Sequence, residues 1–88
     1  MIYPIVSIRD VKTGFLVPTW DANLEAASRG FLMAVSKSPD LMSFVPADFA
    51  LYHVADFDTD SGVMHPVNPP VHIVDASAAF KVGGSDGR

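Results

Sequence analysis

Residues 20–40 read WDANLEAASRGFLMAVSKSPD, and they predict the main helix of the chain. Apolar side chains recur there at the spacing of one helical face, at Leu24, Ala27, Phe31 and Val35. Asp21 or Asn23 can cap the first turn, because a short side-chain oxygen accepts hydrogen bonds from its free amides. Gly30 costs about 1 kcal/mol relative to alanine in the middle of a helix, so we expect it to permit a close approach to a sheet. Pro39 ends the run.

The segments before this helix have the character of a β-hairpin. Residues 2–9 are rich in β-branched side chains and predict a strand. A polar loop ends at Gly14, whose backbone freedom suits a tight turn. Residues 15–20 (FLVPTW) then predict the return strand, which Pro18 breaks because proline lacks an amide donor.

After the helix, the pattern of apolar residues returns to the two-residue period of a strand. Residues 49–57 (FALYHVADF) are apolar on both faces, which indicates a central strand. Residues 63–67 (VMHPV) predict a short return strand that the NPP at 68–70 ends. Residues 71–80 predict a final short strand or extended arm followed by a helical turn.

The element order is therefore β-β-α-β-β, with room for a fifth short strand. This order predicts the α+β class: a small antiparallel sheet with one helix packed on one face. The second face is then open to water unless a second subunit covers it. We expect residues 1–82 to form a single domain and residues 83–88 to form a flexible tail.

Composition narrows the classes of function. The chain has 88 residues, 49% of them hydrophobic and 18% charged, which is typical of a globular domain. Its mean hydropathy is positive, which favours homo-oligomerisation through an apolar surface. The net charge of −4 opposes nucleic-acid binding driven by bulk charge, so a local basic patch is needed. No apolar run has the length of a membrane helix, so we expect no membrane association and a cytosolic location.

Residues 56–62 (DFDTDSG) place three carboxylates on alternate positions before a glycine. A calcium-binding EF-hand loop requires glycine at its sixth position and glutamate at its twelfth. These positions hold Ser61 and Val67 when Asp56 is the first. A hairpin turn explains the same residues, with Gly62 at positive φ and the polar side chains bonding to turn amides. The turn is the favoured interpretation, and the carboxylates concerned are Asp56, Asp58 and Asp60.

Neither a metal site nor an active site is indicated. A hairpin would bring His53 near His65, but the spacing of these residues and His72 matches no compact zinc motif. The chain has no cysteine, no GxSxG and no phosphate-binding loop followed by a helix. We therefore expect no metal, no cofactor and no enzymatic activity.

Aromatic and basic side chains remain as candidates for recognition. Aromatic rings on an exposed sheet can stack unpaired bases while a few cations hold the phosphates. The candidate phosphate contacts are Arg9, Lys12 and Arg29, and the candidate stacking residues are Tyr3, Trp20 and Tyr52. The competing interpretation places these aromatic rings in the core or in a dimer interface.

Three motifs in order resemble a known viral family. They are SIRDVKTGF at residues 7–15, a W-x2-N-x3-A-x-RGF-x2-AV pattern at 20–35, and PADFALYHVADFDTDSG at 46–62. Together they resemble the small nonstructural protein of gokushoviruses, the Chlamydia-phage-like branch of the microviruses, over about residues 3–74. The resemblance implies a protein made in the infected bacterium that is not part of the virion. It also implies a role as a DNA-binding or genome-synthesis accessory protein without catalytic residues.

Two functions are consistent with these observations. The first is a non-enzymatic accessory protein that binds single-stranded DNA or the replication complex in the cytoplasm of the infected bacterial host. The second is a protein–protein interaction module, a homodimer or a partner of the viral replication initiator, with no direct contact to nucleic acid.

Overall fold

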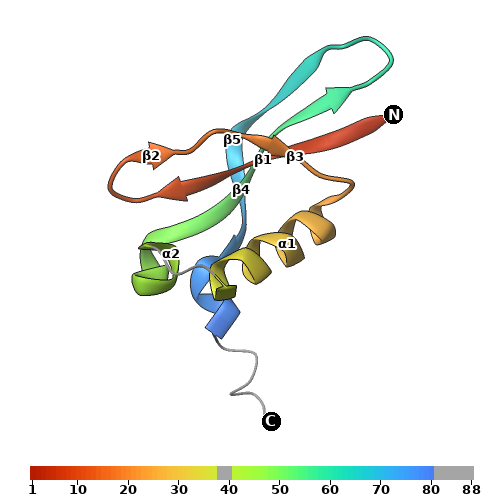
Figure 1. Ribbon diagram of the computed structural model, residues 1–88. Coiled ribbons are helices and arrows are strands. Elements are labelled where there is room, and N and C mark those ends of the chain that lie inside the picture. Colours follow the sequence, from red (N-terminus) through yellow and green to blue (C-terminus); the bar gives the residue numbers. More distant parts are fainter. Residues whose placement is uncertain (38–40, 81–88) are drawn as a thin grey trace.

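The computed structural model describes residues 1–37 and 41–80, and it has the α+β architecture that the sequence predicts (Figure 1). The predicted tail at 83–88 lies outside the described residues. Five strands form one sheet, and one long helix packs on it. The elements are β1 (Ile2–Asp10), β2 (Gly14–Phe15), β3 (Thr19–Trp20), α1 (Leu24–Lys37), α2 (Leu41–Phe44), β4 (Phe49–Asp58) and β5 (Met64–Asp75), with 3-10 turns at Pro46–Asp48 and Ala76–Phe80.

All strand pairings in the sheet are antiparallel. The strand order is β2-β1-β4-β5, and β3 shares the outer edge of β1 with β2. Arg9 lies opposite Phe15 in β2, whereas Ile5 lies opposite Trp20 in β3. The predicted break at Pro18 is confirmed, because the return strand consists of two short pieces on either side of it.

Strand β5 is longer than the sequence indicates, and the predicted break at residues 68–70 is wrong. The strand continues from Met64 to Asp75. Pro66 lies opposite Ala55 and Val71 lies opposite His53, so residues 67–70 bulge out opposite Val54 alone. No described strand pairs with the outer edge of β5. Prolines are tolerated there because an outward-facing position needs no amide donor.

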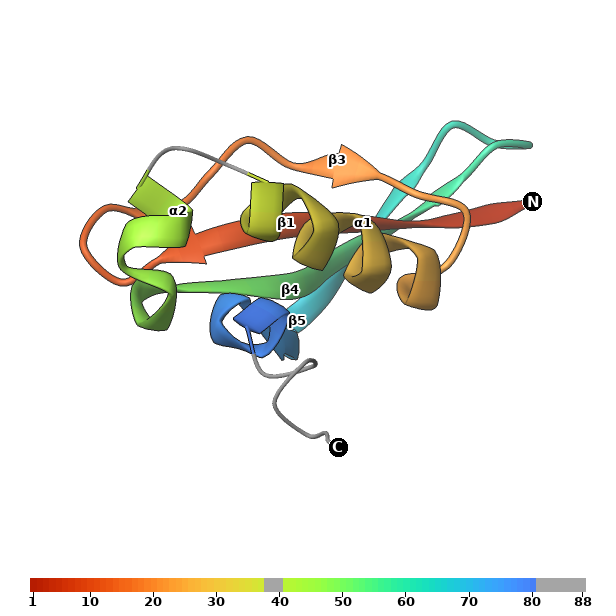
Figure 2. The same ribbon diagram turned by 60° about the horizontal axis from the view of Figure 1, so that its bottom comes forward.

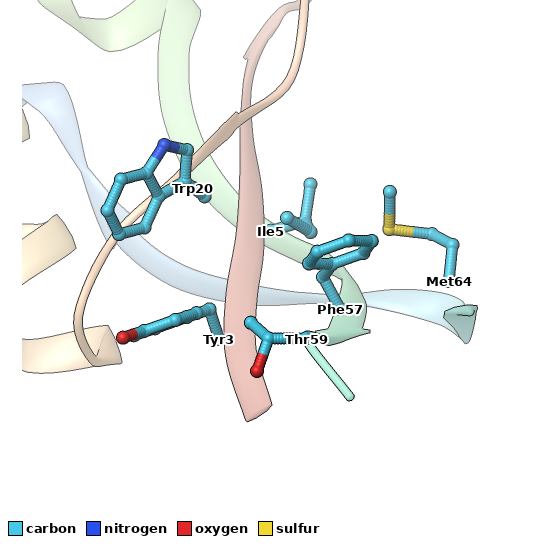
Figure 3. A pocket seen from close by; sticks show the side chains of 6 residues that line it. All are labelled: Tyr3, Ile5, Trp20, Phe57, Thr59 and Met64. Atoms are coloured by element: carbon cyan, nitrogen blue, oxygen red, sulfur yellow. The ribbon is translucent and has the colours of Figure 1, made fainter. Parts of the chain in front are cut away.

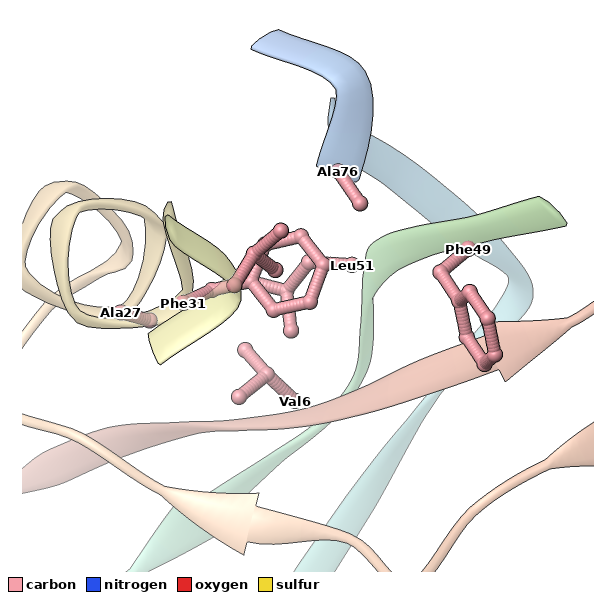
Figure 4. Packing of buried hydrophobic residues seen from close by; sticks show 7 residues of the cluster. Val6, Ala27, Phe31, Phe49, Leu51 and Ala76 are labelled. Carbon is pink, nitrogen blue, oxygen red and sulfur yellow. The ribbon is translucent and has the colours of Figure 1, made fainter. Parts of the chain in front are cut away.

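Helix α1 begins at the predicted cap and packs on one face of the sheet. Asn23 Oδ1 accepts a hydrogen bond from the Ala26 amide at 2.7 Å. The side chains of Ala27, Phe31 and Val35 are buried, while Leu24 remains 37% exposed and does not belong to the core. The core that these residues complete also contains Val6, Phe49, Leu51 and Ala76 (Figure 4).

The helical elements all lie in front of the same face of the sheet (Figure 2). The opposite face carries no described helix, and we call it the open face. The molecule measures 44 × 29 × 22 Å. The β4–β5 hairpin and the start of β1 project beyond α1 along the longest dimension (Figure 1).

Gly30 does not allow a close approach, contrary to the expectation from the sequence. A Cβ atom built on Gly30 would meet no heavy atom within 4 Å. The residue therefore only weakens the helix. Gly62 differs, because its φ of +76° is a conformation that other residues rarely adopt.

We expect Gly30→Ala to raise the free energy of unfolding by roughly 0.5–1 kcal/mol, because alanine favours the helix and meets no obstacle. The matched variant Gly62→Ala should lower it by about 1–2 kcal/mol. Urea unfolding followed by circular dichroism measures both. A loss of stability in Gly30→Ala would show that the helix lies closer to its neighbours than described.

Candidate nucleic-acid interface on the open face

The open face is defined by the alternation of side chains along β1. Val6 of β1 joins the core under α1. Its neighbours in sequence point the other way, because successive side chains of a strand alternate between faces. The residues of β1 on the open face are Tyr3, Ile5, Ser7 and Arg9. Residues opposite them in neighbouring strands share that face, so Trp20, Tyr52 and Phe57 lie there too.

Three rings form a continuous row across the open face. Tyr52 of β4 lies between Phe15 of β2 and His72 of β5, with ring centroids 5.4 Å apart in each pair. Both pairs meet edge to face, at interplanar angles of 80° and 88°. Phe15 is 47% exposed. We call Phe15, Tyr52 and His72 the aromatic row.

Two cations lie beside the aromatic row. Arg9 is directly opposite Phe15. Lys12 is exposed in the turn between β1 and β2. The Asp10 carboxylate stabilises this turn, because it accepts hydrogen bonds from the Lys12 amide at 2.9 Å and from the Thr13 hydroxyl at 3.1 Å. None of the lysine or arginine side chains within residues 1–37 and 41–80 forms a salt bridge. We call Arg9, Lys12 and the aromatic row the basic end of the open face.

The other end of the open face holds an apolar pocket of about 390 Å³ (Figure 3). Its lining is Tyr3, Ile5, Trp20, Phe57, Thr59 and Met64. The Tyr3 and Trp20 rings pack together with centroids 5.2 Å apart and tilted by 59°. Trp20 is nevertheless 65% exposed and Met64 is 52% exposed. We call this cavity the end pocket.

The acidic stretch beside the end pocket is a hairpin turn, as the sequence predicts. Asp58 Oδ1 accepts a hydrogen bond from the Asp60 amide at 2.9 Å. The Gly62 amide donates to the Asp58 carbonyl at 2.8 Å, and Gly62 has the predicted positive φ. The backbone amide of Asp60, together with the hydroxyl and amide of Ser61, holds the pKa of Asp58 below its ordinary value. We call Asp56, Asp58 and Asp60 the acidic hairpin.

The histidines are paired with aspartates rather than with one another. His53 Nε2 lies 2.8 Å from Asp56 Oδ1, and His72 Nε2 lies 2.8 Å from Asp75 Oδ1. His65 lies opposite Asp56, the partner of His53, and the predicted proximity of His53 and His65 stays a prediction. In the described ranges no three histidine or carboxylate side chains gather in the manner of a metal site.

Each His–Asp pair depends on an irregularity in its strand. Residues three apart in a regular strand point to opposite faces. The register of β4 shifts at Val54, and that of β5 shifts at Ile73. Each shift adds one residue between histidine and aspartate, as a β-bulge does, and so brings both side chains to one face. The repeated His-x-x-Asp spacing is a signal that sequence reasoning missed.

The structure brings together some of the predicted contact residues. Arg9 and Tyr52 share the open face, and Lys12 lies in the turn that follows β1. Tyr3 and Trp20 lie on the same face but in the end pocket. Arg29 belongs to α1, which packs on the opposite face, and it lies beside Leu24, Leu32 and Ile73.

Sequence reasoning did not select Phe15 and His72, although both are neighbours of Tyr52. Their place is set by strand register, which composition does not give.

Residues 3–79 match the family model described as Phage ORF5 protein. The chain belongs to the Phage ORF5 family. This finding confirms that it is a phage protein, as the resemblance in the sequence indicates, while the narrower assignment to gokushoviruses stays a prediction. Neither the curated proteins nor the solved structures that were searched gave a match. Within the described ranges, no helix of this phage protein has the length and apolar character needed to span a bilayer.

The lowered pKa of Asp58 predicts a pH-dependent contribution of the hairpin turn to stability. A carboxyl group whose pKa is lower in the folded state than in the unfolded state stabilises the fold at pH values above its unfolded-state pKa. This contribution is lost as the pH falls through the folded-state pKa. Asp58→Asn should therefore be less stable than the parent at pH 7, and the difference should shrink as pH falls below the ordinary carboxyl pKa of about 3.9. Urea unfolding across this range measures the difference. A gap that stays constant with pH would contradict the assigned role of the charge.

Proposed function

We propose that this phage protein is a non-enzymatic accessory factor that binds single-stranded DNA at the basic end of its open face. The place of action would be the cytoplasm of the infected bacterium, during synthesis of the single-stranded genome. The observation that carries the proposal is the aromatic row, which lies on an uncovered sheet face beside two cations without salt-bridge partners in the described residues.

Stacking supplies the first part of the interaction. Every base has a π-face, so aromatic side chains bind bases with little regard to sequence, and each stacked base contributes about 1–3 kcal/mol. Phe15, Tyr52 and His72 span three strands, which gives a platform wider than one ring. An extended strand of DNA crossing this row would meet the rings in turn. We therefore expect binding without marked sequence specificity.

Phosphate contacts supply the second part. Arg9 and Lys12 have no ionic partner in the described structure. Binding of a phosphate would therefore not require either side chain to break an existing salt bridge. The acidic hairpin lies at the far end of the sheet, which limits its repulsion of phosphate near the aromatic row; the carboxylate beside the row is that of Asp75, which pairs with His72. Two phosphate contacts predict a log–log salt slope of about −1.4. Affinity should therefore be modest and sensitive to salt.

Tyr3, Trp20 and Arg29 are not needed for this proposal. The two rings line the end pocket and do not belong to the basic end. Arg29 lies on the helix side of the sheet. These positions separate the DNA-binding hypothesis from the alternative, in which the open face is a protein–protein interface. The exposed end pocket favours that alternative as a second function at the opposite end.

We predict that Arg9→Gln weakens binding of a labelled oligothymidylate and makes its salt slope shallower by about 0.7. Tyr52→Leu should weaken binding by about 5- to 150-fold, because the aliphatic side chain cannot stack. Fluorescence anisotropy over a salt series gives both values.

The matched controls are Arg29→Gln and Phe44→Leu, since Arg29 lies on the helix side and Phe44 is an 81% exposed ring outside the row. Neither control should change affinity. The proposal fails if the parent protein does not bind at low micromolar concentration in low salt, or if each control weakens binding as much as its test variant. Light scattering shows in parallel whether a dimer forms, and a dimer that protects Tyr52 and binds no DNA would favour the alternative.

A further inference from the structure

The surface around the end pocket offers apolar contact and no charge. None of the six residues that line the pocket is acidic or basic. The two polar groups of the lining have partners within the chain. The Tyr3 hydroxyl donates to Met1 Sδ at 3.3 Å, and the Thr59 hydroxyl donates to the Met1 carbonyl at 3.2 Å. What fills the pocket must therefore present an apolar surface to it.

The charged residues near the pocket either face away from it or are paired. The residues of β1 opposite Asp56 and Asp58 belong to the helix side of the sheet, because side chains alternate along a strand. The Asp60 carboxylate lies 3.2 Å from the terminal amine of Met1, which offsets its charge. The next charged residue of β1 on the open face is Arg9, about 13 Å along the strand from the pocket. Two copies of this surface can therefore meet without placing like charges against one another.

The same surface has both a hollow and side chains that project from its rim. Trp20 of β3 and Met64 of β5 lie at the two sides of the pocket, and both are more than half exposed (Figure 3). A two-fold interface brings the same patch of both copies together, so the patch must be complementary to itself. This patch meets the requirement, because the rim side chains of one copy can enter the hollow of the other.

The size of the surface suits a weak dimer. Its exposed large apolar side chains, Met1, Trp20, Val63 and Met64, present on the order of 500 Å² in each copy. Two copies would bury about 1,000 Å², which is at the low end of the range for protein interfaces and is typical of transient association. The chain as a whole is 18% charged, against about 25% in an average domain, which also favours self-association.

We infer that two copies of the chain associate through their end pockets about a two-fold axis, with Trp20 and Met64 of each copy packed against the pocket of the other. Each copy thereby completes the pocket of its partner. The basic ends lie beyond this contact, so the dimer carries two of them. The association does not require DNA, and it goes beyond the proposed function because it names the partner of a separate surface.

Two other occupants fit the pocket less well. A nucleotide needs a cation for its phosphate, and no residue of the lining supplies one. A charged segment of another protein gains no electrostatic attraction from a lining without charges. A second copy brings apolar side chains that match the lining in character.

Sedimentation velocity of the full chain from about 1 µM to 1 mM tests the association, with an expected dissociation constant of about 10–100 µM. Trp20 is the single tryptophan of the chain and lines the pocket, so its fluorescence reports on this surface. Its emission should shift to shorter wavelength over the concentrations at which the dimer forms, because the indole leaves water.

Two variants of β5 show whether the pocket is the interface. Met64→Lys places a cation at the centre of the contact and should weaken dimerisation about tenfold or more, because a charge at an apolar interface is costly and faces its own copy. Val71→Lys adds the same charge at a residue of nearly equal exposure, 53% against 52%, opposite His53 on the helix side. It should leave dimerisation unchanged. Circular dichroism confirms that both variants are folded.

Three results would overturn the inference. They are a monomer at every concentration, which would leave the pocket to a different occupant, a dimer whose formation does not change Trp20 emission, or equal dimerisation of the two lysine variants. Anisotropy of labelled DNA on the parent and on Arg9→Gln reports on the basic end separately, and Arg9→Gln should dimerise like the parent. Failure of one proposal therefore leaves the other intact.

Discussion

The structure depends on the packing of a single helix against one side of the sheet. Phe31 and Val35 of α1 meet Val6 and Leu51 of the two central strands, and this contact forms most of the core. A helix of 14 residues is only about 21 Å long, whereas the molecule extends over 44 Å. The helix can therefore bury only part of one face. The other face and the projecting β4–β5 hairpin remain available for binding.

The two turns at the ends of the sheet differ in charge. The β1–β2 turn carries Lys12 next to Arg9, while the β4–β5 turn carries the acidic hairpin. Aromatic rings of the open face lie near both turns. The outer edge of β5 contains Pro66, Pro69 and Pro70, which cannot donate hydrogen bonds to an added strand. Addition of a further strand at that edge is therefore disfavoured.

The sequence predicts the features that depend on local pattern. The helix, its Asn23 cap and the turn that ends at Gly62 can be deduced from spacing and from the chemistry of single residues. Features that depend on strand register cannot be deduced in this way. Strand β5 continues through residues 68–70, and the two His–Asp pairs form, because the strands contain irregularities in register. The secondary-structure propensities of single residues do not indicate where such irregularities occur. The separation of Arg29 from Arg9 is likewise a tertiary fact, because it is set by the face on which α1 packs.

The most direct test of this account is the solvent accessibility of aromatic side chains on the two faces. Hydroxyl-radical footprinting of the dilute protein, read by mass spectrometry, reports each ring separately. The account predicts rapid oxidation of Trp20 and Phe15, which are 65% and 47% exposed, and slow oxidation of Phe31 and Phe49, which are 6% and 4% exposed. Protection of Trp20 and Phe15 equal to that of Phe31 would contradict it, because the face described as open would then be covered.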